Sequence, residues 1–436
     1  MTTEPAQQEG FIDVDSEQTP PVEKDRLYRL WEEGNWSAKV LDFSQDALDW
    51  REKHGERERA AILWNCSMFL DGEESVTLTL APFVEPAPRP EDKIFLATQI
   101  ADEARHHVFF DRFIREVCQL GQDISTTLSA VRPHLSWGFV QVFTELDRAA
   151  ERLRRNPHSL PLLAQGVVLY HIVIEGMLAH TGQHFLREYT TRTGLLPALG
   201  RGIFFVSRDE SRHIAFGIQL LRELVSKDQR CKEAAIEMLN RILAWTAGVL
   251  APPNHDWSYI TCLGFTPQEM FAFGLRSLHT KLRRAGIDPH EVSELAKLGL
   301  DDPFEVQAER IIKFIEGGVL GTGDAPHLTE ETMETIFTSM RLVASWSQQR
   351  SKPIRASIQW LFDDMQPRYL KLEPGMPPVT GVGRLENPRL TLRCSASDWA
   401  RLSSRRLNQR QAVLSRRLRI SGDWRLALEL PRLLAV

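Results

Sequence analysis

The sequence has few cysteines, and none of them forms a recognisable metal or disulfide motif. Five cysteines are scattered over 436 residues without a Cys-x-x-Cys pair, so neither a disulfide framework nor a thiolate metal site is expected. The N-terminus lacks a basic start followed by an apolar run, so we expect no signal peptide and a cytoplasmic protein. The most apolar segment, residues 166–179, is interrupted by His171 and Glu175 and is too short to span a membrane.

Lysine is absent from the C-terminal part of the chain, where arginine is abundant. Between Arg384 and Arg432 there are twelve arginines, no lysine and four acidic residues, a local charge of +8 within a chain of net charge −5. This asymmetry indicates a separate C-terminal module. A nucleic-acid partner is not expected, because no aromatic platform or recognition helix accompanies the arginines. Solvated surface is their expected role, and peripheral contact with anionic lipid membranes is the alternative.

Helical periodicity dominates the first three quarters of the sequence. The predicted helices cover residues 57–83, 90–120, 133–154, 161–189, 197–226, 231–250 and parts of 267–318.

The pattern changes after a Gly-containing segment that ends at Pro326. One or two amphipathic helices are predicted over residues 329–362, and short alternating segments predict strands at 389–394, 418–420 and 422–430. We therefore predict a mainly α protein with a smaller α+β domain at its C-terminus. The predicted boundaries are a disordered N-terminus over 1–24, a helical domain over 25–320, a linker over 321–327 and an α+β domain over 328–436.

Only two of the 13 histidines have a glutamate three residues before them, and both pairs lie in predicted helices. Residues three apart project from the same face of a helix. Two such pairs, with one glutamate from each of two other helices, form the ligand set of di-iron and di-manganese carboxylate bundles. The pairs are Glu103 with His106 and Glu210 with His213, and the single glutamates are Glu175 and either Glu73 or Glu74.

The chemistry of these residue types supports a metal centre. Glu175 lies in an apolar stretch, where an isolated buried carboxylate would be very costly. Iron and manganese accept mixed nitrogen and oxygen ligands, and four carboxylates neutralise two divalent cations. The sequence therefore predicts a dinuclear carboxylate site.

Ser207–His213 resembles the corresponding helix of the ribonucleotide reductase small subunit and its relatives. The resemblance implies that Asp209, next to a ligand glutamate, orients the ligand His106. Reductase subunits that store a tyrosyl radical have a tyrosine four residues after the first ligand histidine, where this chain has Phe110. The C-terminus also lacks the aromatic, acidic tail that docks the reductase large subunit. A radical-generating reductase subunit without a tyrosyl radical is therefore an alternative function.

Three further stretches, Leu30–Trp50, Gly72–Leu78 and Glu91–Leu96, resemble the ligand-binding oxidases of the same ferritin-like superfamily. The resemblance covers about residues 27–310. It implies an O2-activating oxidase that carries an Mn/Fe or Fe/Fe pair and a bound long-chain fatty acid or similar lipid. It also implies two-electron oxidation of a fatty acyl substrate, and we expect a homodimer. A second alternative is a lipid-binding or lipid-sensing protein whose metal site reacts once, on itself.

The same resemblance assigns residues to the site. It favours Glu73 over Glu74 and implies two metal positions that share Glu103 as a bridge. A Tyr–Val ether cross-link forms beside the metals of that family, and Val76 and Tyr170 occupy the corresponding positions. The implied ligands are Glu73, Glu103 and His106 at the first position, and Glu175, Glu210 and His213 at the second.

Residues 328–436 resemble the sterol carrier protein type two fold. The matching segments are Glu386–Arg393, Ser397–Leu402 and Leu418–Leu428. In that family they form a central strand, the start of the next helix, and a strand that turns at the position of Gly422 into the last helix. The resemblance implies a five-stranded sheet with helices around an apolar tunnel that binds lipid.

Overall fold

The computed structural model describes residues 10–323, 325–350, 353–404 and 406–434.

The chain forms two compact units. The first runs to Ile242 and resumes over Val249–Pro289, and the second combines Leu243–Gly248 with the chain from His290 onward. The first is helical and the second contains the sheet, so the predicted fold class is confirmed. The predicted linker at 321–327 falls inside the second unit.

Packing of two helices explains this difference in the boundary. The helix α15 (Phe304–Glu316) contacts α16 (Glu330–Arg350), and the short α14 (Ser293–Ala296) also contacts α16. The glycines between α15 and α16 therefore connect two helices of one unit. From the sequence alone, the turn between α15 and α16 could not be distinguished from a flexible linker at a domain boundary.

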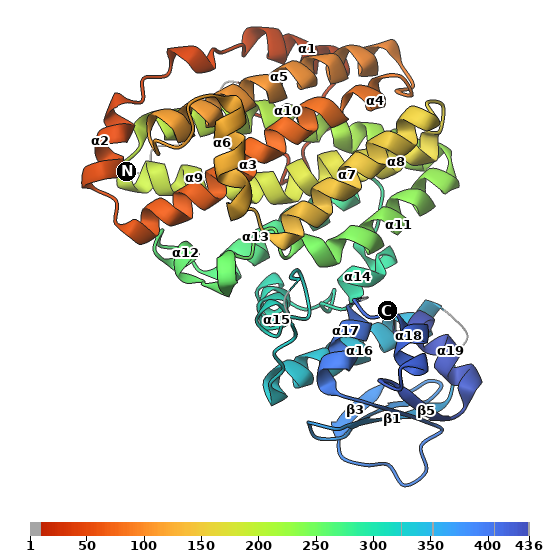
Figure 1. Ribbon diagram of the computed structural model, residues 1–436. Coiled ribbons are helices and arrows are strands. Elements are labelled where there is room, and N and C mark those ends of the chain that lie inside the picture. The colour runs from red at the N-terminus through yellow and green to blue at the C-terminus, as the bar shows by residue number, and fades with distance from the viewer. Residues whose placement is uncertain (1–9, 324, 351–352, 405, 435–436) are drawn as a thin grey trace, which may run out of the picture. The chain divides into compact units, whose positions relative to one another are not determined.

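Four long helical segments form the core of the first unit (Figure 1). The helix α3 (Glu56–Thr79) packs against α5 (Pro90–Glu116), and α10 (Pro197–Lys227) packs against both α5 and a continuous helical segment, Leu160–Thr193. All four agree with helices predicted from periodicity. The other helices of this unit include α1 (Lys24–Glu33), α2 (Ser44–Glu52), α4 (Ala81–Val84), α6 (Ile124–Val131), α7 (Trp137–Arg155), α12 (Ser258–Thr261), α13 (Pro267–Arg284) and most of α11 (Gln229–Thr246).

The continuous segment is made of three parts. They are α8 (Leu160–Val167), the π-helix η3 (Val168–Ala179) and α9 (His180–Thr193). By length and composition alone this segment could cross a membrane, so the short-segment argument from the sequence does not hold. However, 89% of its most apolar 18-residue window is buried inside the structure, which is typical of a core helix. Its apolar surface is thus covered by the other helices of the bundle.

Two acidic side chains of α2 hold the start of α10. The carboxylate of Asp46 accepts hydrogen bonds from the backbone amides of Ala198 and Leu199, at 2.9 and 2.8 Å. Asp49 accepts one from the amide of Leu196 at 2.9 Å. The first amides of a helix have no hydrogen-bond partner within the helix, so these carboxylates supply one. Their negative charge also interacts favourably with the positive end of the helix dipole. They thereby fix the helix that carries the Glu-x-x-His pair at 210–213.

The predicted disorder of residues 1–24 is wrong for the part that the structure describes. Residues 1–9 lie outside the described residues, but Ile12 and Val14 are buried in the first unit. The amide of Ile12 donates to Ser211 Oγ at 3.1 Å. The polar composition of the segment concealed two apolar side chains that are spaced for burial on one side of an extended chain.

The second unit contains a five-stranded sheet with strand order β3-β2-β1-β4-β5. The central pair β1 and β4 is parallel, and the other neighbouring pairs are antiparallel. The strands are β1 (Ala356–Phe362), β2 (Arg368–Leu372), β3 (Val379–Val382), β4 (Leu390–Cys394) and β5 (Arg419–Gly422), and the helices after β4 are α17 (Ala396–Ser403), α18 (Gln409–Leu414) and α19 (Trp424–Leu433).

The predicted strands at 389–394 and 418–420 are confirmed as β4 and β5. The strand predicted over 422–430 is wrong, because β5 ends at Gly422 and the helix α19 begins at Trp424. The helix predicted to reach residue 362 ends at Arg350. The rest of that segment contains β1, whose side chains are buried along most of its length. A strand covered on both faces has no polar alternation, so a short apolar run cannot be distinguished from a helix by periodicity. Trp360 illustrates this burial, because its ring packs edge-on against Phe337 on one element and Trp399 on another.

Candidate metal centre

The four core segments of the first unit bring six predicted ligands together in its interior. Their carboxylate oxygens and imidazole nitrogens form two overlapping groups, and within each group one donor atom from every residue lies within 4.8 Å of the others. All six side chains are buried. Glu103 and Glu210 belong to both groups, so the geometry offers two bridging carboxylates where the sequence predicted one. The first group is Glu73, Glu103, His106 and Glu210, and the second is Glu103, Glu175, Glu210 and His213.

The two shared glutamates divide their oxygens between the two histidines. Glu103 Oε2 lies 3.2 Å from His106 Nδ1, and Glu103 Oε1 lies 3.2 Å from His213 Nδ1. The Glu210 oxygens repeat this pattern at 3.8 and 3.6 Å. Each remaining glutamate faces one histidine, Glu73 at 3.6 Å from His106 and Glu175 at 3.3 Å from His213. The arrangement therefore has two halves joined by carboxylates.

Hydrogen bonding on the outer side leaves the inner nitrogens free for a metal ion. His106 Nε2 lies 3.3 Å from Asp209 Oδ2, and His213 Nε2 lies 3.1 Å from Asp102 Oδ2. A carboxylate can only accept, so each Nε2 carries a hydrogen, and in the neutral imidazole, the form that binds a metal, each Nδ1 presents a lone pair. Among the described residues, both Nδ1 atoms are buried without a hydrogen-bond partner, as is one oxygen each of Glu175 and Glu210. This set of unpaired donors fits two metal ions.

The electrostatics also require positive charge at the centre. Burial raises the pKa of Glu73 and of Glu175 well above the ordinary value, and neighbouring carboxylates add to the effect. Bound divalent cations would favour the ionised forms.

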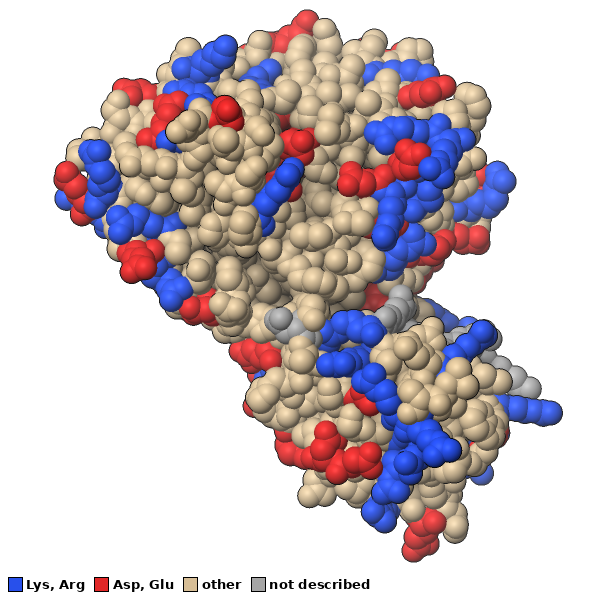
Figure 2. All heavy atoms as spheres, viewed as in Figure 1, with Lys and Arg blue, Asp and Glu red and all other residues tan. Residues whose placement is uncertain are grey.

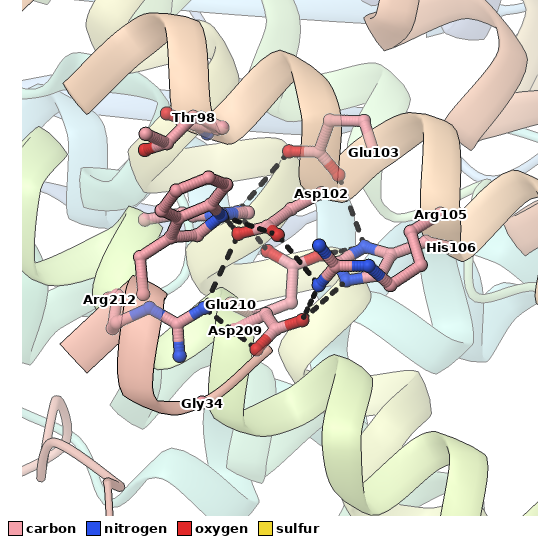
Figure 3. Close-up of polar contacts among 12 residues, drawn as sticks. Gly34, Thr98, Asp102, Glu103, Arg105, His106, Asp209, Glu210 and Arg212 are labelled. Carbon is pink, nitrogen blue, oxygen red and sulfur yellow. Dashed lines mark hydrogen bonds and ion pairs between the residues drawn. The ribbon is translucent and has the colours of Figure 1, made fainter. Parts of the chain in front are cut away.

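Two aspartates and two arginines lie beside the ligand His106 (Figure 3). Figure 3 shows Arg212 reaching both aspartates, at 2.7 Å from Asp209 and 3.3 Å from Asp102. Arg105 lies 3.0 Å from Asp102 and 3.5 Å from Asp209. The two arginine charges balance the two aspartate charges, so these arginines do not neutralise the four glutamates.

The N-terminal arm supplies two tryptophans. The indole of Trp36 donates to Asp209 at 2.7 Å, and the indole of Trp31 donates to Asp102 at 3.0 Å. The sequence predicted that Asp209 orients His106, but it gave no role to Asp102. The signal was present, because Asp-Glu-x-Arg-His occurs twice, at 102–106 and 209–213.

The π-helix η3 explains how Tyr170 reaches the centre. On an α-helix, a residue five positions before Glu175 lies on a different face, but π-helical hydrogen bonds join residues five apart and bring these two into line. The Tyr170 hydroxyl donates to Glu103 Oε1 at 2.6 Å. Gln99 of α5, which the sequence did not single out, donates to Glu175 at 2.8 Å and to the Tyr170 hydroxyl at 3.2 Å.

An apolar cavity of about 70 Å³ adjoins the carboxylates. Val76 and Tyr170, the predicted cross-linking pair, both line it. The stacked rings of Phe139 and Phe143 form another part of its wall, with centroids 4.2 Å apart. Glu73 also borders the cavity, whereas its neighbour Glu74 does not. This agrees with the prediction that Glu73, and not Glu74, is the metal ligand.

Comparison with known proteins agrees with this geometry. Residues 20–245 match the family described as ribonucleotide reductase, small chain, and residues 337–435 match the SCP-2 sterol transfer family.

Solved structures of R2-like ligand-binding oxidases have the same fold. One from Sulfolobus acidocaldarius is 25% identical over 62% of this chain and 93% of its own, with a TM-score of 0.51. A variant with an aerobically reconstituted Mn/Fe cofactor is 26% identical over 61% of this chain and 93% of its own, again with a TM-score of 0.51. The predictions of a ferritin-like dimetal-carboxylate oxidoreductase and of a lipid-carrier-like domain are confirmed. The chain therefore belongs to the ribonucleotide reductase small chain family, and an SCP-2 sterol transfer domain follows its helical domain.

Proposed function

We propose that the first unit binds an Mn/Fe or Fe/Fe pair and uses O2 to oxidise a long-chain fatty acid or a similar lipid. The observation that carries this proposal is the position of the six ligands, which face one another beside an apolar cavity. One of the solved relatives carries an Mn/Fe cofactor, and the donor set of this chain fits such a pair. When bound, the metal pair supplies electrons for the reduction of O2.

The ligands divide into two positions in this proposal. Glu103 and Glu210 span both positions, and Asp209 and Asp102 orient one histidine each. The first position takes Glu73 and His106, and the second takes Glu175 and His213.

An acyl chain would approach the centre through the apolar cavity. The cavity volume of about 70 Å³ is below the range of pockets that enclose whole ligands. A long acyl chain would therefore require the stacked rings of Phe139 and Phe143 to move. Except for the carboxylates, Tyr170 and Asn65, the cavity wall is apolar, which suits hydrocarbon better than a polar substrate.

The second unit would hold or deliver the lipid. It contains a largely apolar groove of about 390 Å³, within the range of ligand-binding pockets. The match to the SCP-2 sterol transfer family supports this role.

We also propose an ether cross-link between Val76 and Tyr170. Formation of the C–O bond removes the phenol hydrogen and the Val76 Cβ hydrogen, and the two electrons and two protons pass to O2. Both residues border the same cavity, and the phenol already lies against Glu103. The cross-link would lower the mass of the chain by two hydrogen atoms.

Neighbouring glutamates provide a matched test of the metal assignment. We expect Glu73→Ala to lose metal on purification from the native host under air, because it removes a buried donor of the first group. Glu74→Ala should keep the wild-type metal content, since Glu74 is outside both groups. Elemental analysis would measure both proteins, and full occupancy in Glu73→Ala would contradict the assignment.

Mass spectrometry tests the cross-link and separates two rival functions. Protein loaded with metal without oxygen and then exposed to air should lose two hydrogens, and Tyr170→Phe should not. Tyr189→Phe is the control, because Tyr189 is buried but lies outside the cavity. Repeated oxidation of a fatty acid by the cross-linked protein would support the oxidase, whereas a single reaction per chain would favour the sensing function.

The reductase alternative would have to generate its radical without a tyrosine at position 110. Phe110 is fully buried and stacks on Phe69 with ring centroids 4.9 Å apart, and it has no phenol oxygen. We therefore expect no ribonucleotide reduction when a cognate large subunit is added. Turnover that depends on this chain would overturn the choice of function.

A further inference from the structure

The groove of the second unit opens among three exposed apolar side chains. Leu414, Trp424 and Leu428 all line the groove, yet 85%, 54% and 79% of their surface is exposed. Among the described residues, Leu414 and Leu428 are the most exposed of the large hydrophobic side chains. Isolated exposed leucines are common, but their gathering at one opening indicates an interaction site. We call these three residues the rim.

The rim residues lie on two helices. Trp424 and Leu428 are four residues apart on α19 and therefore share a face. Leu414 ends α18, and Arg410, four residues earlier on that helix, lines the groove beside it. Arg410 is the one charged residue of the described groove lining.

Basic side chains accompany the rim. Figure 2 shows basic residues spread over the face of this unit where α17 to α19 and β5 lie in Figure 1. Arg410, Arg416 and Arg425 are exposed, and within the described part of the chain none of them pairs with an acid. Other arginines of this segment do pair, as Arg417 does with Asp398, whereas no described acid neutralises the charge of the three arginines near the rim. Glu429 is the one acid on α19.

We propose that the rim docks on an anionic lipid bilayer, so that a lipid passes directly between the bilayer and the groove. Leu414, Trp424 and Leu428 would enter the boundary between headgroups and acyl chains, and the neighbouring arginines would contact lipid phosphates. A nucleic acid would satisfy the arginines but would leave the leucines against a charged backbone. The inference goes beyond the oxidase chemistry and does not depend on the metal centre.

Vesicle flotation of the full chain tests the proposal. The protein should float with phosphatidylcholine vesicles that contain one third phosphatidylglycerol, and it should bind pure phosphatidylcholine vesicles much more weakly. High salt should weaken binding to the anionic vesicles, because it screens the arginines. Equal affinity for both kinds of vesicle, or binding to neither, would overturn the proposal.

Matched variants locate the docking surface. Leu414→Ser combined with Leu428→Ser should weaken binding about tenfold or more, because both lose apolar area that enters the bilayer. Met376→Ser combined with Val382→Ser is the control. Met376 and Val382 are also exposed apolar residues, but they lie at or next to β3, which is the opposite edge of the sheet from β5.

Charge is tested in the same way. Arg410→Gln should weaken binding to anionic vesicles about fivefold, the effect of one basic residue near such a surface. Arg384→Gln, an equal change of charge in the exposed loop after β3, should have little effect. Equal losses in the test variant and its control would place docking elsewhere and overturn the proposal.

Trp424 provides a direct optical readout. Its fluorescence, taken as the difference between wild type and Trp424→Phe, should shift to the blue on anionic vesicles as the indole leaves water. Two other outcomes would overturn the proposal. One is binding of random duplex DNA that Arg410→Gln abolishes while vesicles remain unbound. The other is self-association that the double leucine variant prevents, in the absence of vesicle binding.

Discussion

At the scale of single residues, the aspartates next to the ligand glutamates determine how the histidines face the centre. Asp102 and Asp209 each hold the Nε2 of the histidine from the other helix, and both accept an indole hydrogen from the N-terminal arm. The helices α5 and α10 are thereby joined through reciprocal contacts. The orientation of each imidazole thus depends on an aspartate that is not one of the six predicted ligands.

Replacing each aspartate separately should weaken metal binding at a different position. Asp102→Asn should affect the position that contains His213, and Asp209→Asn the position that contains His106, each by about 10- to 100-fold in affinity. Metal titration with anomalous scattering at the Mn and Fe edges would measure occupancy at each position. Asp111→Asn is a control, because this buried aspartate of α5 pairs with Arg115 instead. Equal weakening of both positions by one variant would contradict the assignment.

Asp15 provides a second residue-scale prediction, on stability. Burial would raise the pKa of Asp15, but a hydrogen bond from His180 and the charge of Lys281 outweigh it and hold that pKa well below the ordinary value. Asp15→Asn leaves the fully buried Lys281 without its charge partner. We expect the free energy of unfolding to fall by about 2 kcal/mol at pH 7, less than for a fully buried pair because the Asp15 side chain is 42% exposed. Glu17→Gln, which alters an exposed pair with Arg283, should cost less than about 1 kcal/mol.

The pH dependence of this effect has a definite sign. A carboxyl group whose pKa is lowered by folding contributes stability above its unfolded pKa, about 3.9, and loses it as the pH falls further. The difference between wild type and Asp15→Asn should therefore shrink below about pH 4, whereas a change between about pH 7 and 5 would come from His180, whose pKa Asp15 raises. Urea unfolding at several pH values would measure it. A difference that does not shrink below about pH 4 would show that Asp15 is not ionised in the folded protein.

The six ligands could be predicted because Glu-x-x-His spacing is a local property of the sequence. Gln99 could not, since its role depends on the π-helix, which places Tyr170 and Glu175 within reach of one amide. The burial of Ile12 and its bond to Ser211 are likewise contacts between segments distant in sequence.

At the scale of elements, the π-helix η3 and α10 must approach each other closely. Gly217 of α10 faces His171 of η3, and a Cβ at that position would overlap the His171 side chain. His171 Nε2 in turn lies 3.1 Å from Gln99 Oε1. Burial lowers the pKa of His171 to about 3, so it is neutral at physiological pH and its Nε2 donates the hydrogen. Close helix packing thus positions the segment that carries Glu175.

Gly217→Ala should therefore disturb the metal centre from a distance. Overpacking typically costs about 1 to 3 kcal/mol, and displacement of η3 should also lower metal content at the position containing Glu175. Ser226→Ala, an exposed change near the end of the same helix, should alter neither property. Thermal unfolding and elemental analysis would measure both effects. Wild-type stability and metal content in Gly217→Ala would mean that the two helices can separate at no cost.

At the scale of the whole molecule, the chain consists of two units with separate cores. The domain types could be predicted, because the change from long helices to short strands is visible in the sequence. The boundary could not, because a glycine-rich turn between packed helices has the composition of a linker. All six candidate ligands lie in the first unit, and the groove lies in the second.

This division predicts that metal stabilises one unit and leaves the other unchanged. A ligand that binds the folded state at a thousandfold excess over its Kd stabilises it by about 4 kcal/mol, which raises the Tm of a unit this large by about 10 °C. Calorimetry of the full chain should thus show two transitions, and only one of them should move when metal is added or chelated. The control is the metal-free Glu73→Ala protein, in which addition of metal should move that transition much less than in wild type. If both transitions moved together by the same amount, the two units would unfold as one, and the lipid-binding domain would depend on the metal centre for its stability.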